Sequence, residues 1–425
     1  MQASKTKQPF YIIIILILSG EAVFILPFVL ARIFRPTYLE VFDITNLQYG
    51  ICGSIYGIVA LLSYVFGGVL ADKFHPRFLI SVSLILTALG GFYLSTYPSY
   101  FNLKLLFGYW GFTTIFLFWA AMIKATRIWG GAKRQGMAFG FLDGGRGLVA
   151  AGFGTFGILI FSLFIDVDIS ETSLIERKEA FRYVILFASL AVSIIGILAF
   201  YFLKGLKSDE NLSKQNSNVL TISSFKQIMK IPSVWLLMII VLCAYVGYKA
   251  TDIYSLYAKD VMLYDDIESA KVGTSLLYMR PIIGVVIGLL ADRTRATLWL
   301  IIGFVFTLIT SLIFASGIIS NETILFFILS IGLMALGVYS VRVLYFATME
   351  EGKIPLAITG VAVGFISIVG YTPDIFSGPM IGVLLDNSPG ELGHQHVFLV
   401  LAGFTLIGLI ASAVFYRISK REIAV

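Results

Sequence analysis

Apolar segments long enough to cross a lipid bilayer recur along the whole chain. The hydrocarbon core of a bilayer is about 30 Å thick, so a helical crossing needs about 20 predominantly apolar residues. We predict twelve crossings, at residues 10–33, 46–71, 78–97, 103–124, 137–165, 181–203, 232–257, 270–291, 296–317, 323–346, 356–385 and 396–417. Segments this long and this apolar indicate helices, which satisfy their own backbone hydrogen bonds in lipid. The sequence therefore predicts an all-α membrane protein.

Charged residues are scarce and unevenly placed. They make up 13% of the chain, against about 25% in an average soluble domain. Most Lys and Arg fall in the loops that share a side with the N-terminus, and such loops are retained in the cytoplasm. We therefore expect a multi-pass protein of a bacterial-type cytoplasmic (inner) membrane with both termini inside. Topology accounts for the net charge of +6, so no nucleic-acid partner is expected.

The longest polar connection divides the predicted helices six and six. Residues 204–230 are typical of a flexible cytoplasmic linker, which predicts one six-helix bundle over 1–203 and a second over 231–425. After the second helix of each half stands a related sextet, Gly68–Lys73 (GVLADK) and Gly288–Arg293 (GLLADR). Internal repeats of this kind in a membrane protein indicate a transporter whose substrate binds between the repeats, near the middle of the membrane.

The repeated sextet resembles a known signature. G-x-x-x-D-[KR] in the loop joining the second and third helices of each half is similar to the motif of the major facilitator superfamily, and the likeness in helix count and linker covers the whole chain. A further pattern is similar to facilitators of organic anions such as sugar phosphates and hexuronates. It comprises Trp129, Arg134, Gly136, Gly140, Asp143, Arg146, Gly147, Gly360, Gly364, Gly370, Pro373, Asp374, Phe376, Pro379, Gly382 and Asp386.

Ionisable residues within the apolar segments are the candidates for a substrate site. A charge at the centre of a membrane helix costs about 2.5–3.5 kcal/mol, so it is kept for a function or a partner. In the family that the chain resembles, helices 1, 4, 7 and 10 and faces of 2, 5, 8 and 11 line a central cavity. We therefore expect side chains from both bundles to converge on one hydrated chamber and bind a small polar organic solute. The candidate substrate-binding residues are Glu21, Arg146, Lys249, Arg280 and Arg342.

Arginine favours an anionic or zwitterionic solute, because its planar fork binds carboxylate or phosphate through two parallel hydrogen bonds. A structural reading stays open for three candidates. Arg146 follows Asp143, and Asp252 follows Lys249, at a spacing that allows a pair within one helix. Arg280 precedes Pro281, where a kink would free carbonyl groups for it to bind.

Carboxylates in the same segments are candidates for coupling transport to an ion. Glu21 and Asp374 have no basic residue close by in their own helices, so they are the better proton sites, and Asp252 is the third candidate. Burial favours the protonated form of a carboxyl group and a neighbouring base opposes this. Sodium remains the alternative ion.

A gate is predicted at the cytoplasmic ends of the helices. An aspartate there can cap the N-terminus of a neighbouring helix, where unpaired N–H groups favour negative charge. By the pseudo-symmetry that the resemblance implies, Asp72 faces the start of helix 11 near Pro355, and Asp292 faces the start of helix 5 near Gly136. The gating candidates are Asp72, Lys73, Arg77, Asp292 and Arg293.

No enzymatic arrangement is apparent. There is no phosphate loop, so no ATP hydrolysis and no cofactor are expected. His394 and His396 are predicted in an extracytoplasmic loop without a metal. The sequence predicts a monomeric secondary active transporter that works by alternating access, importing its solute with protons. The alternatives are a drug or metabolite exporter working by proton antiport and, further off, a channel.

Overall fold

The computed structural model describes residues 8–131, 135–165, 173–206, 228–349, 351–354 and 359–421. Within these ranges the regular structure is entirely helical. Twelve helical segments of the described chain are long and apolar enough to span a membrane. The predicted fold class is therefore confirmed, and each predicted crossing has a counterpart whose ends differ by a few residues.

Two of the helices that begin before their predicted starts, those predicted at 181 and 270, are preceded by capping boxes. Helix α9 (Leu174–Phe202) begins after Ser173, whose side chain accepts a hydrogen bond from Glu176 N while the Glu176 side chain returns one to Ser173 N. Helix α14 (Asp266–Arg293) begins after Asp265 with the same reciprocal box to Glu268. Such boxes satisfy the free N–H groups of a polar first turn. A prediction from hydropathy misses that first turn because it contains charged residues.

By its internal contacts the chain divides into two compact units. The first unit comprises Met1–Ala31 and Ile55–Lys214, and the second comprises Arg32–Ser54 and Gln215–Val425. The sequence assigns the segment Arg32–Ser54 to the first bundle, whereas in the structure it clusters with the second unit. The predicted division into two six-helix bundles at residues 204–230 stays a prediction.

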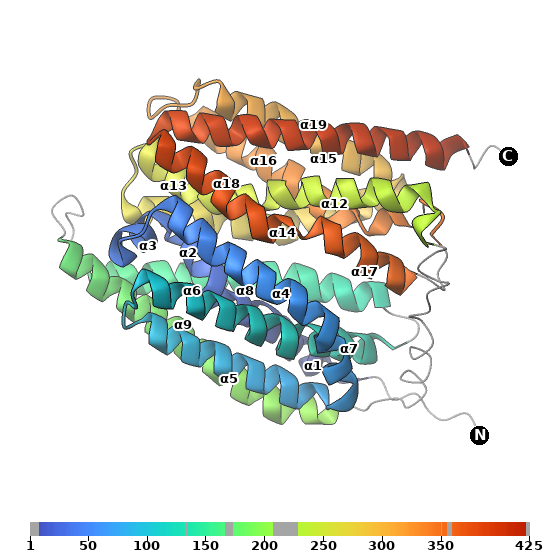
Figure 1. Ribbon diagram of the computed structural model, residues 1–425, viewed down its shortest axis with the longest axis horizontal. Coiled ribbons are helices and arrows are strands. Elements are labelled where there is room, and N and C mark those ends of the chain that lie inside the picture. The colour runs from blue at the N-terminus through green and yellow to red at the C-terminus, as the bar shows by residue number, and fades with distance from the viewer. Residues whose placement is uncertain are drawn as a thin grey trace. The chain divides into compact units, whose positions relative to one another are not determined.

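The first unit is built from long helices (Figure 1). Its elements are α1 (Phe10–Phe24), the π-helix η1 (Ile25–Val29), α4 (Asn46–Lys73) from Ile55 onward, α5 (Pro76–Leu94), α6 (Tyr100–Gly111), the π-helix η2 (Phe112–Trp119), α7 (Ala120–Gly130), α8 (Gln135–Leu163), α9 and the short η4 (Leu203–Gly205). Helix α5 packs along α9, and α1 packs on α8 and α9. The first crossing widens to η1 at Pro27, whose ring cannot continue the regular hydrogen-bond pattern.

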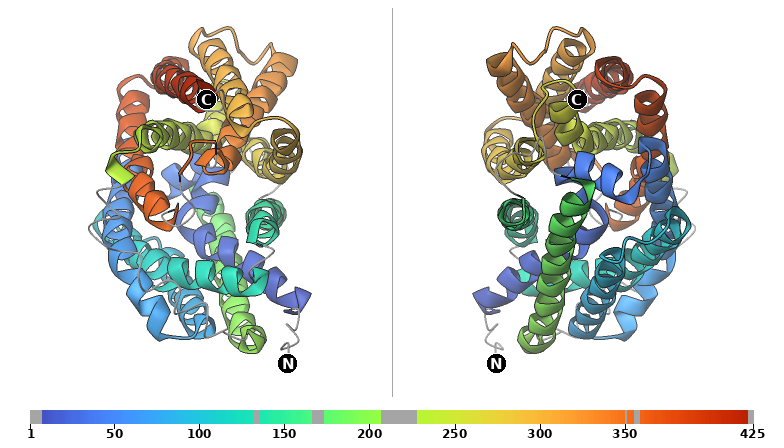
Figure 2. Two further views of the ribbon diagram at one scale, coloured as in Figure 1. Left: turned by 90° about the vertical axis from the view of Figure 1, so that its right-hand side faces the viewer. Right: turned by 90° about the vertical axis from the view of Figure 1, so that its left-hand side faces the viewer.

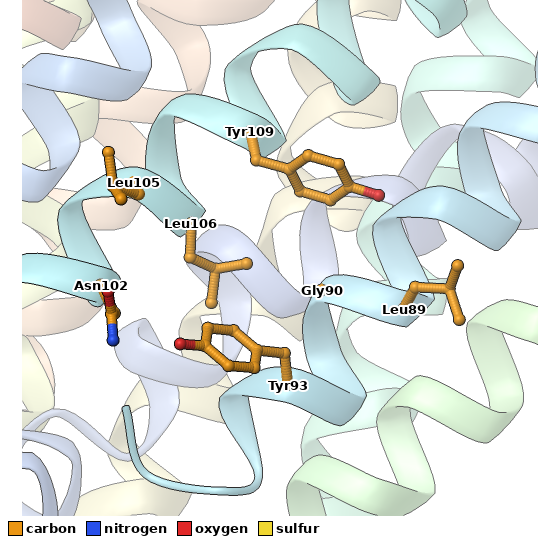
Figure 3. A pocket seen from close by; sticks show the side chains of 7 residues that line it. All are labelled: Leu89, Gly90, Tyr93, Asn102, Leu105, Leu106 and Tyr109. Atoms are coloured by element: carbon orange, nitrogen blue, oxygen red, sulfur yellow. The ribbon is translucent and has the colours of Figure 1, made fainter. Parts of the chain in front are cut away.

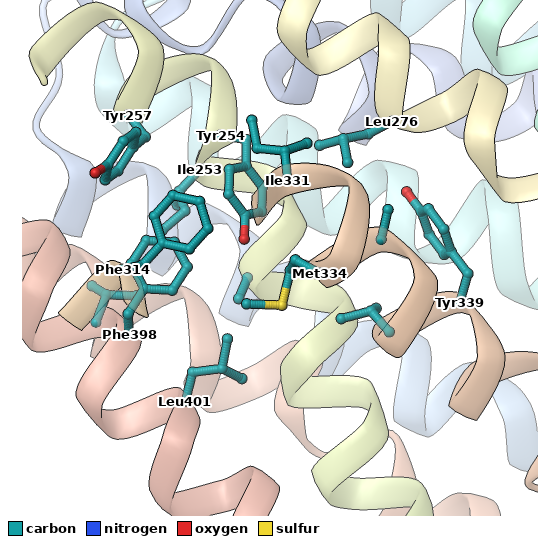
Figure 4. Close-up of a cluster of buried hydrophobic side chains, with 14 of the residues drawn as sticks. Ile253, Tyr254, Tyr257, Leu276, Phe314, Ile331, Met334, Tyr339, Phe398 and Leu401 are labelled. Carbon is teal, nitrogen blue, oxygen red and sulfur yellow. The ribbon is translucent and has the colours of Figure 1, made fainter. Parts of the chain in front are cut away.

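The second unit contains the remaining helices, many of which Figure 2 shows end-on. They are α2 (Leu30–Ile33) from Arg32 onward, α3 (Arg35–Phe42), the start of α4, α12 (Pro232–Ala250), η5 (Thr251–Ile253), α13 (Tyr254–Asp260), α14, α15 (Ala296–Ala315), α16 (Ile324–Leu344), η6 (Ala347–Met349), α17 (Thr359–Gly370), α18 (Pro373–Asn387) and α19 (Glu391–Arg421). Aromatic rings pack in its core, where the Phe314 and Phe398 ring centroids lie 4.5 Å apart (Figure 4).

Close backbone approach holds the start of α4 against α18 within the second unit. A Cβ atom added to Gly50 would lie 2.3 Å from the backbone carbon of Gly378, and one on Gly382 would lie 2.5 Å from the Leu47 backbone. Only glycine leaves room for this crossing. The Asp386 carboxylate also caps α4, accepting hydrogen bonds from Asn46 N at 3.1 Å and Leu47 N at 2.7 Å. These contacts explain why residues 32–54 cluster with the second unit.

Replacing Gly50 with valine should destabilise the protein, by about 1–3 kcal/mol or more, because the new side chain meets backbone that cannot rotate away. The measurement is the thermal melting of detergent-solubilised protein followed by fluorescence. Gly53→Ala is the matched control on the same helix, since nothing lies within 4 Å of a Cβ there. Equal melting temperatures for Gly50→Val and wild type would contradict the close crossing.

Candidate functional site

Four charged residues of the second unit lie where its helices are interrupted. Lys249 is near the end of α12, and Asp252 is in η5, the short 3₁₀ turn before α13. Asp374 is in the first turn of α18, just after the break that follows Gly370. Arg32 is in α2, before the chain turns at Phe34 into α3. Transporters place solute and ion sites at such discontinuous helices, where backbone groups and helix ends are available.

The pairing of these charges runs between helices. Lys249 Nζ lies 2.7 Å from Asp374 Oδ1, and Tyr245 OH donates to both oxygens of the same carboxylate at 3.1 Å. Arg32 Nε donates to Asp252 Oδ1 at 2.5 Å. Lys249 and Asp252 thus each pair with a residue of another segment, whereas the sequence had left open a pair between the two within one helix. Asp374, which lacks a base in its own helix, takes Lys249.

Two guanidinium groups share the ring of Tyr248. Arg342 Cζ lies 3.5 Å from the ring centroid and Arg32 Cζ lies 4.9 Å from it, both within cation–π range. Arg32 Nη1 also donates to the Tyr248 hydroxyl at 3.0 Å. The tyrosine thus holds two like charges close together, an arrangement that favours a negatively charged ligand.

Arg280 belongs to the same region. It is 4% exposed, and the Tyr339 hydroxyl interacts electrostatically with Arg32, Arg280 and Arg342. We call Arg32, Lys249, Arg280 and Arg342, with the carboxylates of Asp252 and Asp374, the basic cluster. Its four cations exceed its two carboxylates.

Arg35 lies beside the basic cluster, outside the membrane-spanning segments. Its guanidinium stacks 4.1 Å from the Tyr49 ring centroid and donates to Asn46 Oδ1 at 3.0 Å. Burial lowers the pKa of Arg35 from its ordinary value, and the nearby Tyr49 and Asp252 act in the opposite direction by raising it. Arginine still stays protonated in proteins, so this group adds a positive charge.

In the first unit, two of the predicted substrate-binding residues, Glu21 and Arg146, form an ion pair. Arg146 Nε donates to Glu21 Oε2 at 2.9 Å, and both side chains are buried. The guanidinium carbon lies 5.4 Å from the Phe24 ring centroid and 5.9 Å from that of Trp119. Arg146 thus forms this ion pair with a residue of another helix. The alternative that the sequence had left open was Asp143, in the same helix as Arg146. Convergence of these two residues with the basic cluster on one chamber stays a prediction.

The predicted gate is only partly described. Lys73, Asp292 and Arg293 are exposed, while the Arg77 guanidinium carbon lies 4.4 Å from the Phe78 ring and 5.2 Å from the Phe200 ring. The Asp72 side chain, Pro355 and the Gly136 surroundings lie outside the described residues. Gating by this set stays a prediction.

Two residues lie where the sequence reasoning did not expect them. Arg32 was not among the predicted site residues but is 5% exposed in the basic cluster; its position inside the apolar segment 10–33 was the signal that marked it. His394 was expected in a loop but is in α19, fully buried, with Nε2 3.0 Å from Asp260 Oδ2. No sequence pattern joins His394 to Asp260, because the pair forms only by packing.

A pocket of about 340 Å³ in the first unit lies between α5 and α6 (Figure 3). Its lining is Leu89, Gly90, Tyr93, Asn102, Leu105, Leu106 and Tyr109. None of these is charged, and Leu89, Tyr93 and Leu105 are exposed whereas Leu106 is buried. A groove lined by uncharged side chains suits acyl chains rather than a charged solute. We therefore place the candidate site at the ionised residues described above.

Comparison with known proteins agrees with this architecture. The family model for the Major Facilitator Superfamily matches residues 12–378. The chain is 26% identical to the inner membrane protein YihN of Escherichia coli K12, over 98% of each chain. It is 25% identical to the inner membrane protein YqcE of the same bacterium, over 95% of this chain and 93% of that one.

Solved structures share the fold. The inward-facing, unoccupied structure of a bacterial homolog of the human lysosomal transporter Spinster matches with a TM-score of 0.74 at 15% identity, over 98% of this chain and 99% of that one. The nucleoside transporter NupG matches with a TM-score of 0.69 at 14% identity, over 94% and 99%. The family match spans most of the sequence. The twelve apolar helices of the described chain fit a multi-pass protein of the inner membrane, where the names of both Escherichia coli relatives place them. The chain is therefore a secondary transporter rather than an enzyme, and it belongs to the major facilitator superfamily.

Proposed function

We propose that this transporter moves a small organic anion or zwitterion by alternating access, taking it up together with protons. The observation that carries the proposal is the positive excess of the basic cluster, in which four cations face two carboxylates. Several positive charges gathered at membrane depth are costly, and a negatively charged ligand lowers that cost. A substrate carboxylate or phosphate supplies that negative charge.

The proposed substrate-binding residues are Lys249, Arg280 and Arg342 in the second unit and Glu21 with Arg146 in the first. Arginine forks match oxyanions in shape as well as charge. The Tyr245 and Tyr248 rings stack on each other beside Lys249 and Arg342, so they offer a flat surface to the uncharged part of the solute. An amphipathic organic anion fits this combination better than an inorganic ion does.

Proton coupling is proposed for Glu21, Asp252 and Asp374, with sodium as the other ion that carboxylates can bind. Each carboxylate has a cationic partner in its own unit, at 2.5–2.9 Å. A pair of this kind responds to protons or to a competing anion, since either changes the charge balance. We further propose cytoplasmic termini and a monomeric transporter.

Export of lipophilic cations is the nearest competing function. Aromatic rings suit such drugs, but the guanidinium groups around Tyr248 and Tyr339 would repel them. A channel is disfavoured because a duplicated gate motif and paired charges at helix breaks are features of a protein that alternates between states.

The proposal is tested by ligand-induced stabilisation of the purified protein. Hexuronates, sugar phosphates, dicarboxylates and amino acids should include compounds that raise the melting temperature, because a ligand of the folded state stabilises it by RT ln(1 + [L]/Kd). Saturable counterflow of the same compound in proteoliposomes should follow. Neutral glucose and the lipophilic cation tetraphenylphosphonium are the controls. Stabilisation and counterflow by the lipophilic cation alone would refute the anion proposal.

A further inference from the structure

The groove between α5 and α6 has an apolar stretch and a polar end. Leu89 and Leu105 are 54% and 59% exposed and Gly90 adds no side chain, so the apolar stretch is open to the surrounding bilayer. Its volume of about 340 Å³ is at the small end of the range of ligand pockets, about 300–1,000 Å³, which suits one hydrocarbon chain. Tyr93 and Asn102 form the polar end, beside residues 95–99 that connect the two helices.

The polar end offers hydrogen-bond donors that the protein does not use. Neither the Tyr93 hydroxyl nor the Asn102 side chain forms a hydrogen bond with any part of the chain that the structure describes. Figure 3 shows the Tyr93 hydroxyl on the side of its ring that faces Asn102. Tyrosine is enriched at this level of a membrane protein, where acyl chains meet headgroups. The two donors therefore match the ester carbonyl groups of a phospholipid, which lie at the same level.

Three cations lie beside the polar end. Two of them share the ring of Tyr97 in the connection: Lys178 Nζ is 5.6 Å and Arg182 Cζ is 5.5 Å from the ring centroid. The third is Lys104 on α6, whose Nζ lies 4.6 Å from the Tyr100 ring centroid. Since α9 supplies two of these cations and α6 supplies the third, positive charge borders the polar end from two helices.

The acids of the same region do not neutralise these three cations, which form no ion pair within the ranges that the structure describes. Glu176 is held at the start of α9 by Ser173, which donates to its carboxylate from both the N–H and the hydroxyl. Glu179 is one residue from Lys178, so its position is about 100° around the helix. Unpaired basic groups at the level of lipid headgroups attract anionic lipids.

We propose that the groove between α5 and α6 binds one anionic phospholipid, with an acyl chain along its leucines and the headgroup phosphate on the three cations. Phosphatidylglycerol has the required chemistry, since it carries a net negative phosphate next to its ester groups. Phosphatidylethanolamine has the same chains and phosphate, but it adds an ammonium group that the cations repel. The ligand is a lipid of the bilayer, so the inference is independent of the transported solute.

The test is native mass spectrometry of the delipidated full chain in detergent, titrated with phosphatidylglycerol or with phosphatidylethanolamine of the same acyl chains. Wild type should bind the first phosphatidylglycerol about tenfold more tightly, because each basic residue near an anionic headgroup favours binding severalfold. Lys104→Gln combined with Lys178→Gln should remove most of that difference. Arg182 is kept, because its Nε donates to Ser95 O at 3.1 Å and holds the connection. Lys271→Gln, at an exposed lysine predicted on the same side of the membrane, is the control and should bind as wild type does.

A second variant tests the groove itself. Leu89→Trp fills the apolar stretch from an exposed position, so it should weaken binding of both lipids about tenfold without changing the melting temperature of the lipid-free protein. Leu190→Trp is the matched control, at a position on α9 that is 55% exposed.

Three outcomes would overturn the inference. Equal affinity of wild type for the two lipids, or an undiminished difference in the double lysine variant, would remove the headgroup from the three cations. Wild-type binding by Leu89→Trp would remove the acyl chain from the groove. Binding of soluble glycerol 3-phosphate as tight as that of phosphatidylglycerol would show that the ligand is a free phosphate rather than a lipid.

Discussion

Replacing Arg342 with alanine should lower substrate uptake ten- to a hundredfold or more while the protein still folds and inserts. Hydrogen bonds to charged groups are worth about 1.5–3 kcal/mol, and each 1.4 kcal/mol corresponds to a factor of ten. Arg342 stacks on Tyr248, which also receives a hydrogen bond from Arg32. Its loss removes both a ligand donor and half of the positive field around that ring.

Initial uptake rates in proteoliposomes, at matched protein content, measure this effect. Arg342→Lys should retain part of the activity, because it keeps the charge and loses the planar fork. Arg417→Ala, at an exposed position near the end of α19, is the control and should transport as wild type does. Wild-type uptake by Arg342→Ala would remove this residue from the proposed site.

Replacing Arg146 with methionine should destabilise the protein by about 3–5 kcal/mol. The change leaves the Glu21 carboxylate buried without its cation, and an uncompensated buried charge is far costlier than an absent pair. The Phe24 and Trp119 rings near Arg146 cannot replace its charge. The measurement is the melting temperature of the purified protein.

The double variant Glu21→Gln with Arg146→Met should recover most of that stability, since neither charge remains to be desolvated. A double variant as unstable as the single one would show that packing at Arg146, rather than the ion pair, controls stability there. The same variant also tests the coupling role proposed for Glu21. Concentrative uptake equal to wild type in the double variant would exclude that role.

Most of the fold was predictable from the sequence because membrane helices follow from local composition. A helix of about 20 apolar residues satisfies its own backbone hydrogen bonds and presents apolar side chains to the bilayer, whatever it packs against. The exceptions have local physical causes. Leu174 and Asp266 begin their helices early because polar capping boxes precede the apolar runs. The interruption at Thr251–Ile253 had no such marker, since its residues fit a continuous helix equally well.

The identity of the charged residues was readable from the sequence, but their partners were not. Helical spacing suggested Lys249 with Asp252, whereas Lys249 binds Asp374 and Asp252 binds Arg32. Side chains three residues apart can meet on a helix, yet long cations reach acids on other segments when packing brings those acids closer.

The sequence by itself determined that this chain has twelve apolar segments long enough to span a membrane, carries a duplicated motif and places ionisable residues within those segments, because these depend on residue type and order. Only the tertiary structure decided which charges pair with one another and where several cations lie close together. Electrostatic pairing depends on distances of a few ångströms between segments far apart in the chain, and packing alone sets those distances.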